Sequence, residues 1–159
     1  MLHDVVVDAF PSYSETMKNA PSLAPGNGRV VIFYPRLPMA GFNPVPYSGS
    51  GGFAIVQLII DSDQTSVGDQ TFVFIDLPAG LHAVTYTRGG LLANAYSRTV
   101  DVEAGKTTFV EIISEQFKQD YGKVVSSDEA QKLLVNIHHN FKQPLPFNQR
   151  PKGGMSRAF

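Results

Sequence analysis

The stretch that decides the expected fold is Phe72-Val-Phe-Ile-Asp-Leu-Pro-Ala-Gly-Leu-His-Ala-Val-Thr-Tyr-Thr-Arg88. Its first half is made of aromatic, β-branched and aliphatic residues, which fit the pleated and buried surface of a strand. Pro78 has no N–H for a strand ladder, and Gly80 can adopt the positive φ of a tight turn. The second half alternates more loosely between apolar and polar residues. The stretch therefore predicts a β-hairpin of two neighbouring antiparallel strands.

Further strands are predicted on both sides of this hairpin. Short apolar or alternating runs, separated by turn residues, lie at residues 29–34, 53–61, 65–67, 94–103 and 107–115. Frequent turns between short strands are typical of an antiparallel sandwich. We therefore expect a mainly β protein, an antiparallel β-sandwich of about seven short strands.

Two helices are predicted at the ends of the strand region. A Ser followed three residues later by Glu, the capping-box spacing, precedes each of them, as Ser12 with Glu15 and as Ser126 with Glu129. The first helix is expected within residues 11–20 and the second over residues 127–141. The second is amphipathic, with an apolar stripe expected to pack on the sandwich; the stripe consists of Ala130, Leu133, Leu134, Ile137 and Phe141.

The chain is expected to contain one domain with an extension at each end. Residues 29–141 form the sandwich with its helix, residues 1–28 precede it, and residues 142–159 are a basic, Pro-rich and flexible tail. Residues 35–52 are rich in Pro, Gly, Asn and Ser, and a loop of that length is often functional.

Composition excludes several classes of protein. The 159 residues carry a formal net charge of −1, which is not the basic footprint of a nucleic-acid binder. The chain has no cysteine, so disulfides, thiolate zinc sites and a cysteine nucleophile are excluded. No apolar run is long enough to span a bilayer, and the first residues show no signal peptide.

Three segments in this order resemble the DUF2846 family of small bacterial envelope domains, many of which are lipoproteins. They are Leu23-Ala-Pro-Gly-Asn-Gly-Arg-Val-Val-Ile-Phe-Tyr34, Thr71-Phe-Val-Phe-Ile-Asp-Leu-Pro-Ala-Gly-Leu-His82 and Val102-Glu-Ala-Gly-Lys-Thr-Thr-Phe-Val110. The resemblance implies a transthyretin-, prealbumin- or immunoglobulin-like sandwich in the periplasm or cell envelope, with no catalytic residues. The chain departs from this pattern because it lacks a lipobox cysteine. A leader before Met1 would supply export and a lipid anchor, whereas a start at Met1 would favour the cytoplasm.

Residues that suggest chemistry have structural explanations. Adjacent helix residues point about 100° apart, so His138 and His139 cannot readily share a metal ion and are interpreted as surface histidines. The oxygen-rich residues Asp61, Asp63 and Asp69 lack the rest of a calcium loop and are interpreted as turn formers. No serine has a His and an Asp at a familiar spacing. No catalytic, cofactor or metal site is therefore predicted, and a hydrolase would need Ser, His and Asp gathered by folding.

The expected function is that of a non-enzymatic protein-binding or structural module. Loop 35–52 and tail 142–159 would present the contacts, and the expected partner-binding residues are Phe42, Tyr47, Arg88, Arg98, Phe147 and Arg150. Arg88 and Arg98 flank a short loop and could together hold an anion. The alternative is a small-ligand or metal-binding protein that uses loop 35–52 and nearby His and Asp residues. The partner and the oligomeric state stay open.

Overall fold

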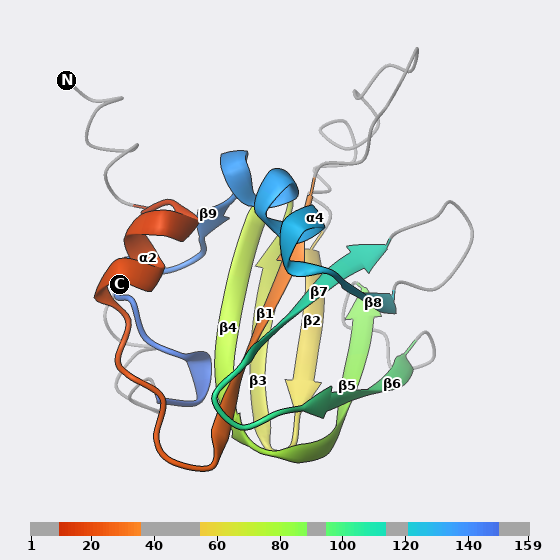
Figure 1. Ribbon diagram of the computed structural model, residues 1–159. Coiled ribbons are helices and arrows are strands. Elements are labelled where there is room, and N and C mark those ends of the chain that lie inside the picture. The colour runs from red at the N-terminus through yellow and green to blue at the C-terminus, as the bar shows by residue number, and fades with distance from the viewer. Residues whose placement is uncertain (1–9, 36–54, 89–94, 114–120, 150–159) are drawn as a thin grey trace, which may run out of the picture.

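Two sheets packed face to face make up most of the structure, a computed structural model that describes residues 10–35, 55–88, 95–113 and 121–149 (Figure 1). The five-stranded sheet has the order β8 (Tyr121–Val125), β7 (Thr107–Ile113), β1 (Asn27–Tyr34), β4 (Thr71–Pro78) and β9 (His138–His139). The four-stranded sheet has the order β3 (Asp63–Gly68), β2 (Ile55–Ile60), β5 (Gly80–Arg88) and β6 (Tyr96–Val102). The described ranges thus contain nine strands, where about seven were expected, and their mainly β character is confirmed.

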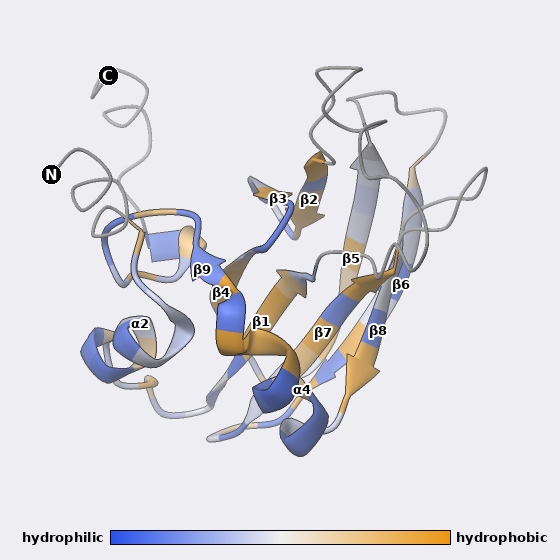
Figure 2. Cartoon of the chain, turned by 90° about the horizontal axis from the view of Figure 1, so that it is seen from above, coloured by the Kyte–Doolittle hydropathy of each residue, from blue (hydrophilic) through white to orange (hydrophobic). Residues whose placement is uncertain are grey.

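The five-stranded sheet is buried on both faces. Side chains alternate along a strand, so Ile32 of β1 points into the core between the sheets while Val31 and Phe33 point to the opposite face. That opposite face is covered by α2 (Tyr13–Asn19) and α4 (Ser127–Leu133). Figure 2 shows the helices and the four-stranded sheet on opposite sides of the five-stranded sheet. This arrangement explains the continuous apolar run of β1, which needs cover on both sides.

The hairpin predicted at Phe72–Arg88 is wrong. β4 pairs with β1 and β9 in one sheet, whereas β5 pairs with β2 and β6 in the other. The chain reverses at Ala79 and Gly80, and Gly80 has a φ of 130°. This reversal carries the chain from one sheet to the other and does not form a hairpin within one sheet. The physical reason is burial: β4 is apolar on both faces and fits the middle of a doubly covered sheet. β5 needs cover on one face only.

The expectation of purely antiparallel pairing is also wrong. β1 runs antiparallel to β4, but it runs parallel to β7 from Arg29 opposite Thr107 to Phe33 opposite Glu111. β9 also runs parallel to β4. The five-stranded sheet is therefore mixed, because strands far apart in sequence are neighbours in it.

Both helix starts are confirmed, and the end of the second helix is corrected. The Ser12 hydroxyl accepts from the Glu15 N–H at 3.2 Å, and that of Ser126 accepts from the Glu129 N–H at 3.1 Å. α4 ends at Leu133 and continues only as the 3-10 helix η2 (Leu134–Asn136), so the helix expected to reach residue 141 is too long.

Residues 137–140 leave the helix because the edge of the five-stranded sheet offers them hydrogen bonds. The His138 N–H donates to the Gln70 carbonyl at 3.1 Å, and the Asn140 N–H donates to the Phe72 carbonyl at 3.2 Å. Val135 and Asn136, which precede them, are weak helix formers. The expected packing of the apolar stripe is confirmed for Ala130, Leu134 and Ile137, which are buried against the five-stranded sheet, and Leu133 is partly buried there. Phe141 is not part of this cluster.

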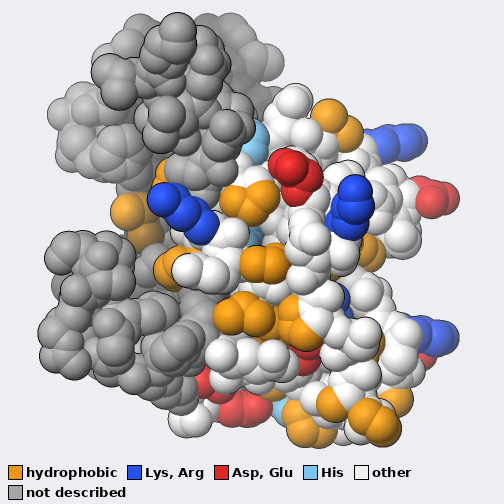
Figure 3. Space-filling view, turned by 90° about the vertical axis from the view of Figure 1, so that its left-hand side faces the viewer, with side chains coloured by type: hydrophobic (Ala, Val, Ile, Leu, Met, Phe, Trp, Pro, Cys, Tyr) orange, Lys and Arg blue, Asp and Glu red, His pale blue; other side chains and the backbone are white. Residues whose placement is uncertain are grey.

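The start of the expected flexible tail is an ordered part of the fold. Phe147 opens the 3-10 helix η3 (Phe147–Gln149), is 5% exposed and lies in the core between the sheets. The Asn148 side-chain amide donates to the Asp76 carbonyl at 2.7 Å. Figure 3 views the molecule from the side of α2 and β9, where hydrophobic side chains lie among charged and polar ones. Residues 150–159 and most of loop 35–52 lie outside the described residues.

Candidate binding surface between strands β6 and β8

The edge strand of each sheet comes close to that of the other at β6 and β8 (Figure 1). Arg98 of β6 bridges them, because its Nη1 donates to the Gly122 carbonyl of β8 at 3.2 Å. A side chain of the four-stranded sheet thus satisfies a main-chain acceptor at the margin of the five-stranded sheet. We call this line of contact the β6–β8 seam.

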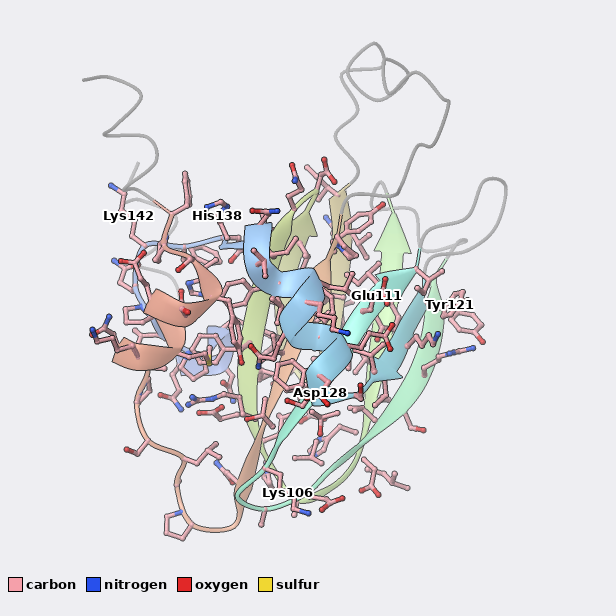
Figure 4. All side chains as sticks on the ribbon, turned by 45° about the horizontal axis from the view of Figure 1, so that its top comes forward. Lys106, Glu111, Tyr121, Asp128, His138 and Lys142 are labelled. Carbon is pink, nitrogen blue, oxygen red and sulfur yellow. The ribbon has the colours of Figure 1, made fainter. Side chains whose placement is uncertain are left out.

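Three side chains meet on the outside of the seam. The Arg98 guanidinium lies 4.3 Å from the ring centroid of Tyr121 and 5.6 Å from that of Tyr96. The two rings are 6.3 Å apart and meet edge to face. Arg98 is exposed and both tyrosines are half-buried, and Figure 4 shows Tyr121 pointing outward from β8. We call this group the Tyr96–Arg98–Tyr121 cluster.

Strand alternation places two members of the cluster. Tyr96 and Arg98 share their side of β6 with Val100 and Val102, which are buried in the core between the sheets. Arg98 therefore extends toward β8 and away from the solvated face of its own sheet. The same alternation explains how a charged residue of an edge strand closes the margin of the core.

Tyr86 and Gly122 form the floor of the seam. Tyr86 is buried, and burial raises the pKa of its hydroxyl, an effect that the positive charge of Arg98 partly opposes. A Cβ atom at Gly122 would overlap the Tyr86 hydroxyl and the Val110 side chain. The position therefore requires a glycine, because only a bare backbone can pass this close to the tyrosine.

Electrostatics keep the guanidinium charged and leave it able to bind an anion. The hydrogen bond with the Tyr96 hydroxyl raises the pKa of Arg98, and desolvation lowers it to a lesser extent. None of the ion pairs found within the described residues involves Arg98. A guanidinium has five N–H donors, and those not directed at Gly122 or Tyr96 can hold a carboxylate or phosphate.

Glu111 lies near the seam but belongs to the helix-covered face. It is opposite Lys123 in the β7–β8 ladder and beside α4 (Figure 4). Burial raises the pKa of Glu111, the neighbouring Glu129 carboxylate adds to the rise, and Lys123 opposes it. Glu111 is therefore a partly desolvated acid packed against a helix.

The residues predicted as partner contacts differ in where the structure places them. Arg98 lies in the exposed cluster, and Arg88 ends β5. Phe147 is buried in the core, so its side chain is not presented to a partner. Phe42, Tyr47 and Arg150 lie outside the described residues. Sequence reasoning missed Tyr96 and Tyr121 as members of the site. The i, i+2 spacing of Tyr96 and Arg98, which places both on one side of a strand, could have indicated Tyr96. Tyr121 could not be found in this way, because β8 was not predicted.

Two histidines of the described ranges, His82 and His139, have structural roles. His82 Nδ1 lies 3.2 Å from Asp61 Oδ2, and its Nε2 lies 2.7 Å from the Pro78 carbonyl, which holds the β4–β5 crossover against the β2–β3 turn. The expectation that both histidines lie on a helix is wrong, because His138 and His139 form β9. His138 is exposed as expected, whereas His139 is buried, with its ring centroid 5.0 Å from that of Phe72.

Metal and membrane sites were also sought within the described ranges. No group of three or more His, Cys, Asp or Glu residues there could hold a metal ion. None of the helices there has the length and hydrophobicity of a bilayer-spanning segment. Comparisons of the chain with protein-family models, with curated proteins and with solved structures find no match.

Proposed function

We propose that this protein is a non-enzymatic binding module of the cell envelope and that the Tyr96–Arg98–Tyr121 cluster contacts a protein partner. The observation that carries the proposal is an exposed guanidinium held between two tyrosine rings and a main-chain carbonyl. Tyr and Arg are the residues most enriched at the energetic centres of protein interfaces. An arginine that is already ordered loses less side-chain entropy on binding than a free one.

The envelope location rests on the resemblance of residues 23–34, 71–82 and 102–110 to the DUF2846 family. The transthyretin-like character of the sandwich rests on the same resemblance. Two sheets packed face to face are compatible with it.

The proposal is tested by capturing partners from an envelope extract with the wild-type protein and with Arg98→Ala and Tyr121→Ala. Tyr121→Ala keeps the Arg98–Gly122 hydrogen bond, so it separates partner contact from closure of the seam. Lys106→Ala is the control, because Lys106 is exposed in the β6–β7 turn, far from Tyr121 (Figure 4). Quantitative mass spectrometry identifies the retained proteins, and thermal unfolding checks that each variant is folded.

We expect at least one protein to be retained by the wild type and by Lys106→Ala and to bind both cluster variants at least about tenfold more weakly. Equal retention by all four proteins would contradict the proposal.

A further inference from the structure

The outer face of the four-stranded sheet is unusually poor in charge. Side chains alternate along each strand, and in each strand of this sheet one alternating set lies in the core. The other set points outward: it consists of the odd-numbered residues of β2, β5 and β6 and the even-numbered residues of β3. Asp101 is the one charged side chain among these outward positions. About 25–35% of the residues on a well-solvated surface are charged. Depletion of charge is what distinguishes the centre of a protein interface from ordinary surface.

The uncharged side chains of this face are hydroxyls, aliphatic groups and the amides of Gln57 and Gln64, and Thr87 at one end of the face is already buried. Thr85 and Ser97 lie side by side on β5 and β6, with their hydroxyl oxygens 2.8 Å apart. Leu81 is 72% exposed, and Ala83 is exposed beside it on the same strand. Neither hydrophobic cluster of the described residues includes a side chain from this face.

We propose that this face binds a second copy of the chain, face to face, to form a two-fold symmetric dimer. A hydroxyl both donates and accepts a hydrogen bond, so a Ser- and Thr-rich face is complementary to itself across a two-fold axis. Because this face carries so little charge, two stacked copies of it bring few like charges together and bury few charged groups. A face that recognised a different protein by charge would instead carry charges for that partner to match.

The small size of the face indicates a weak dimer. Strands about 4.8 Å apart that rise about 3.3 Å per residue give a four-stranded face of roughly 400 Å² over about six residues. Two such faces bury about 800 Å², and the relief of the side chains adds to this, so the interface is smaller than the about 1,200 Å² of standard specific interfaces and belongs with weak, transient ones. The dimer is therefore expected to be weak and reversible, so that it forms only as the protein concentration rises.

This dimer does not depend on the Tyr96–Arg98–Tyr121 cluster. Arg98 points to the opposite side of β6 from Ser97 and Thr99. The two proposals can therefore succeed or fail separately.

Sedimentation velocity over a concentration series tests the dimer. We expect the wild-type protein to shift from monomer to dimer as its concentration rises. Ala83→Glu places a carboxylate in the middle of the face and should raise the dissociation constant at least about tenfold, because the charge is desolvated opposite its own copy. Val135→Glu is the matched control, since Val135 is exposed on η2, on the helix side of the five-stranded sheet.

Circular dichroism checks that both variants are folded. Arg98→Ala should dimerise like the wild type. A wild type that stays monomeric at every concentration overturns the proposal. So does a folded Ala83→Glu variant that dimerises as well as Val135→Glu does.

Discussion

Arg29 and Asp76 form a buried, bidentate ion pair across the β1–β4 ladder, where they are direct partners in the register. Arg29 Nε donates to Oδ1 at 2.7 Å and Nη2 donates to Oδ2 at 2.9 Å. The same Nη2 donates to the Pro21 carbonyl at 2.7 Å, and the Asp76 carbonyl accepts from the Asn148 amide. The pair thus joins the segment before β1, strands β1 and β4, and the C-terminal segment.

Removing one partner of this pair should be strongly destabilising. Asp76→Ala leaves the Arg29 guanidinium buried without its counter-ion, so we expect the free energy of unfolding to fall by about 3–5 kcal/mol. Urea denaturation measures the change. The double variant Arg29→Met/Asp76→Leu removes both charges and should lose less than Asp76→Ala does. A single variant within about 1 kcal/mol of the wild type would contradict the structural role of the pair.

Gly122→Ala should open the β6–β8 seam. The added methyl group overlaps the Tyr86 hydroxyl and the Val110 side chain, so β8 must move or the core must strain. We expect a loss of about 1–3 kcal/mol in urea denaturation. Tyr86→Phe combined with Gly122→Ala removes one of the overlapping groups and should recover part of the loss. Additive effects of the two changes would show that the hydroxyl is not the obstacle.

Phe147→Ala should destabilise the fold as a core substitution does. The ring lies between the sheets and reaches them from a segment that follows the last strand. We expect a loss of about 3–5 kcal/mol, measured by chemical denaturation. Phe10→Ala is a suitable control, because Phe10 is 44% exposed and its removal should change stability little. If residues 142–149 were a solvated tail, the two variants would behave alike.

Glu111→Gln should stabilise the protein at neutral pH. Burial raises the pKa of Glu111 in the folded state above its usual value of 4.5, so the folded state binds this proton more tightly than the unfolded state does. The contribution of Glu111 to stability therefore falls as the pH rises from the pKa of Glu111 in the unfolded state to its pKa in the folded state. Above this pH range, ionised Glu111 is unfavourable in the folded protein. The melting temperature of Glu111→Gln should exceed that of the wild type at neutral pH.

The advantage of Glu111→Gln should disappear below pH 4.5, where the wild-type carboxyl is protonated in both states. Glu129→Gln removes only the smaller of the two causes of the raised pKa and also a favourable charge in the first turn of α4, so it should stabilise the protein less than Glu111→Gln does. A melting temperature that falls in Glu111→Gln at neutral pH would contradict this account.

Features that depend on neighbouring residues in the chain could be predicted from the sequence alone. Ser12 and Ser126 mark helix starts because a capping hydroxyl bonds an N–H three residues further on. The apolar run of β1 and the turn at Ala104-Gly105-Lys106 likewise show where a strand and a reversal must lie. These signals established a mainly β chain with a helix near each end.

Features that depend on which strands become neighbours were decided only by the tertiary structure. A Pro-Ala-Gly reversal serves a hairpin and a crossover between sheets equally well, and the choice at β4 and β5 followed from the need to bury β4 on both faces. The Tyr96–Arg98–Tyr121 cluster joins residues from two sheets, and Phe147 is buried among core side chains that both sheets supply. Local patterns specify which side chains must leave water, but the surfaces that cover them come from distant parts of the chain.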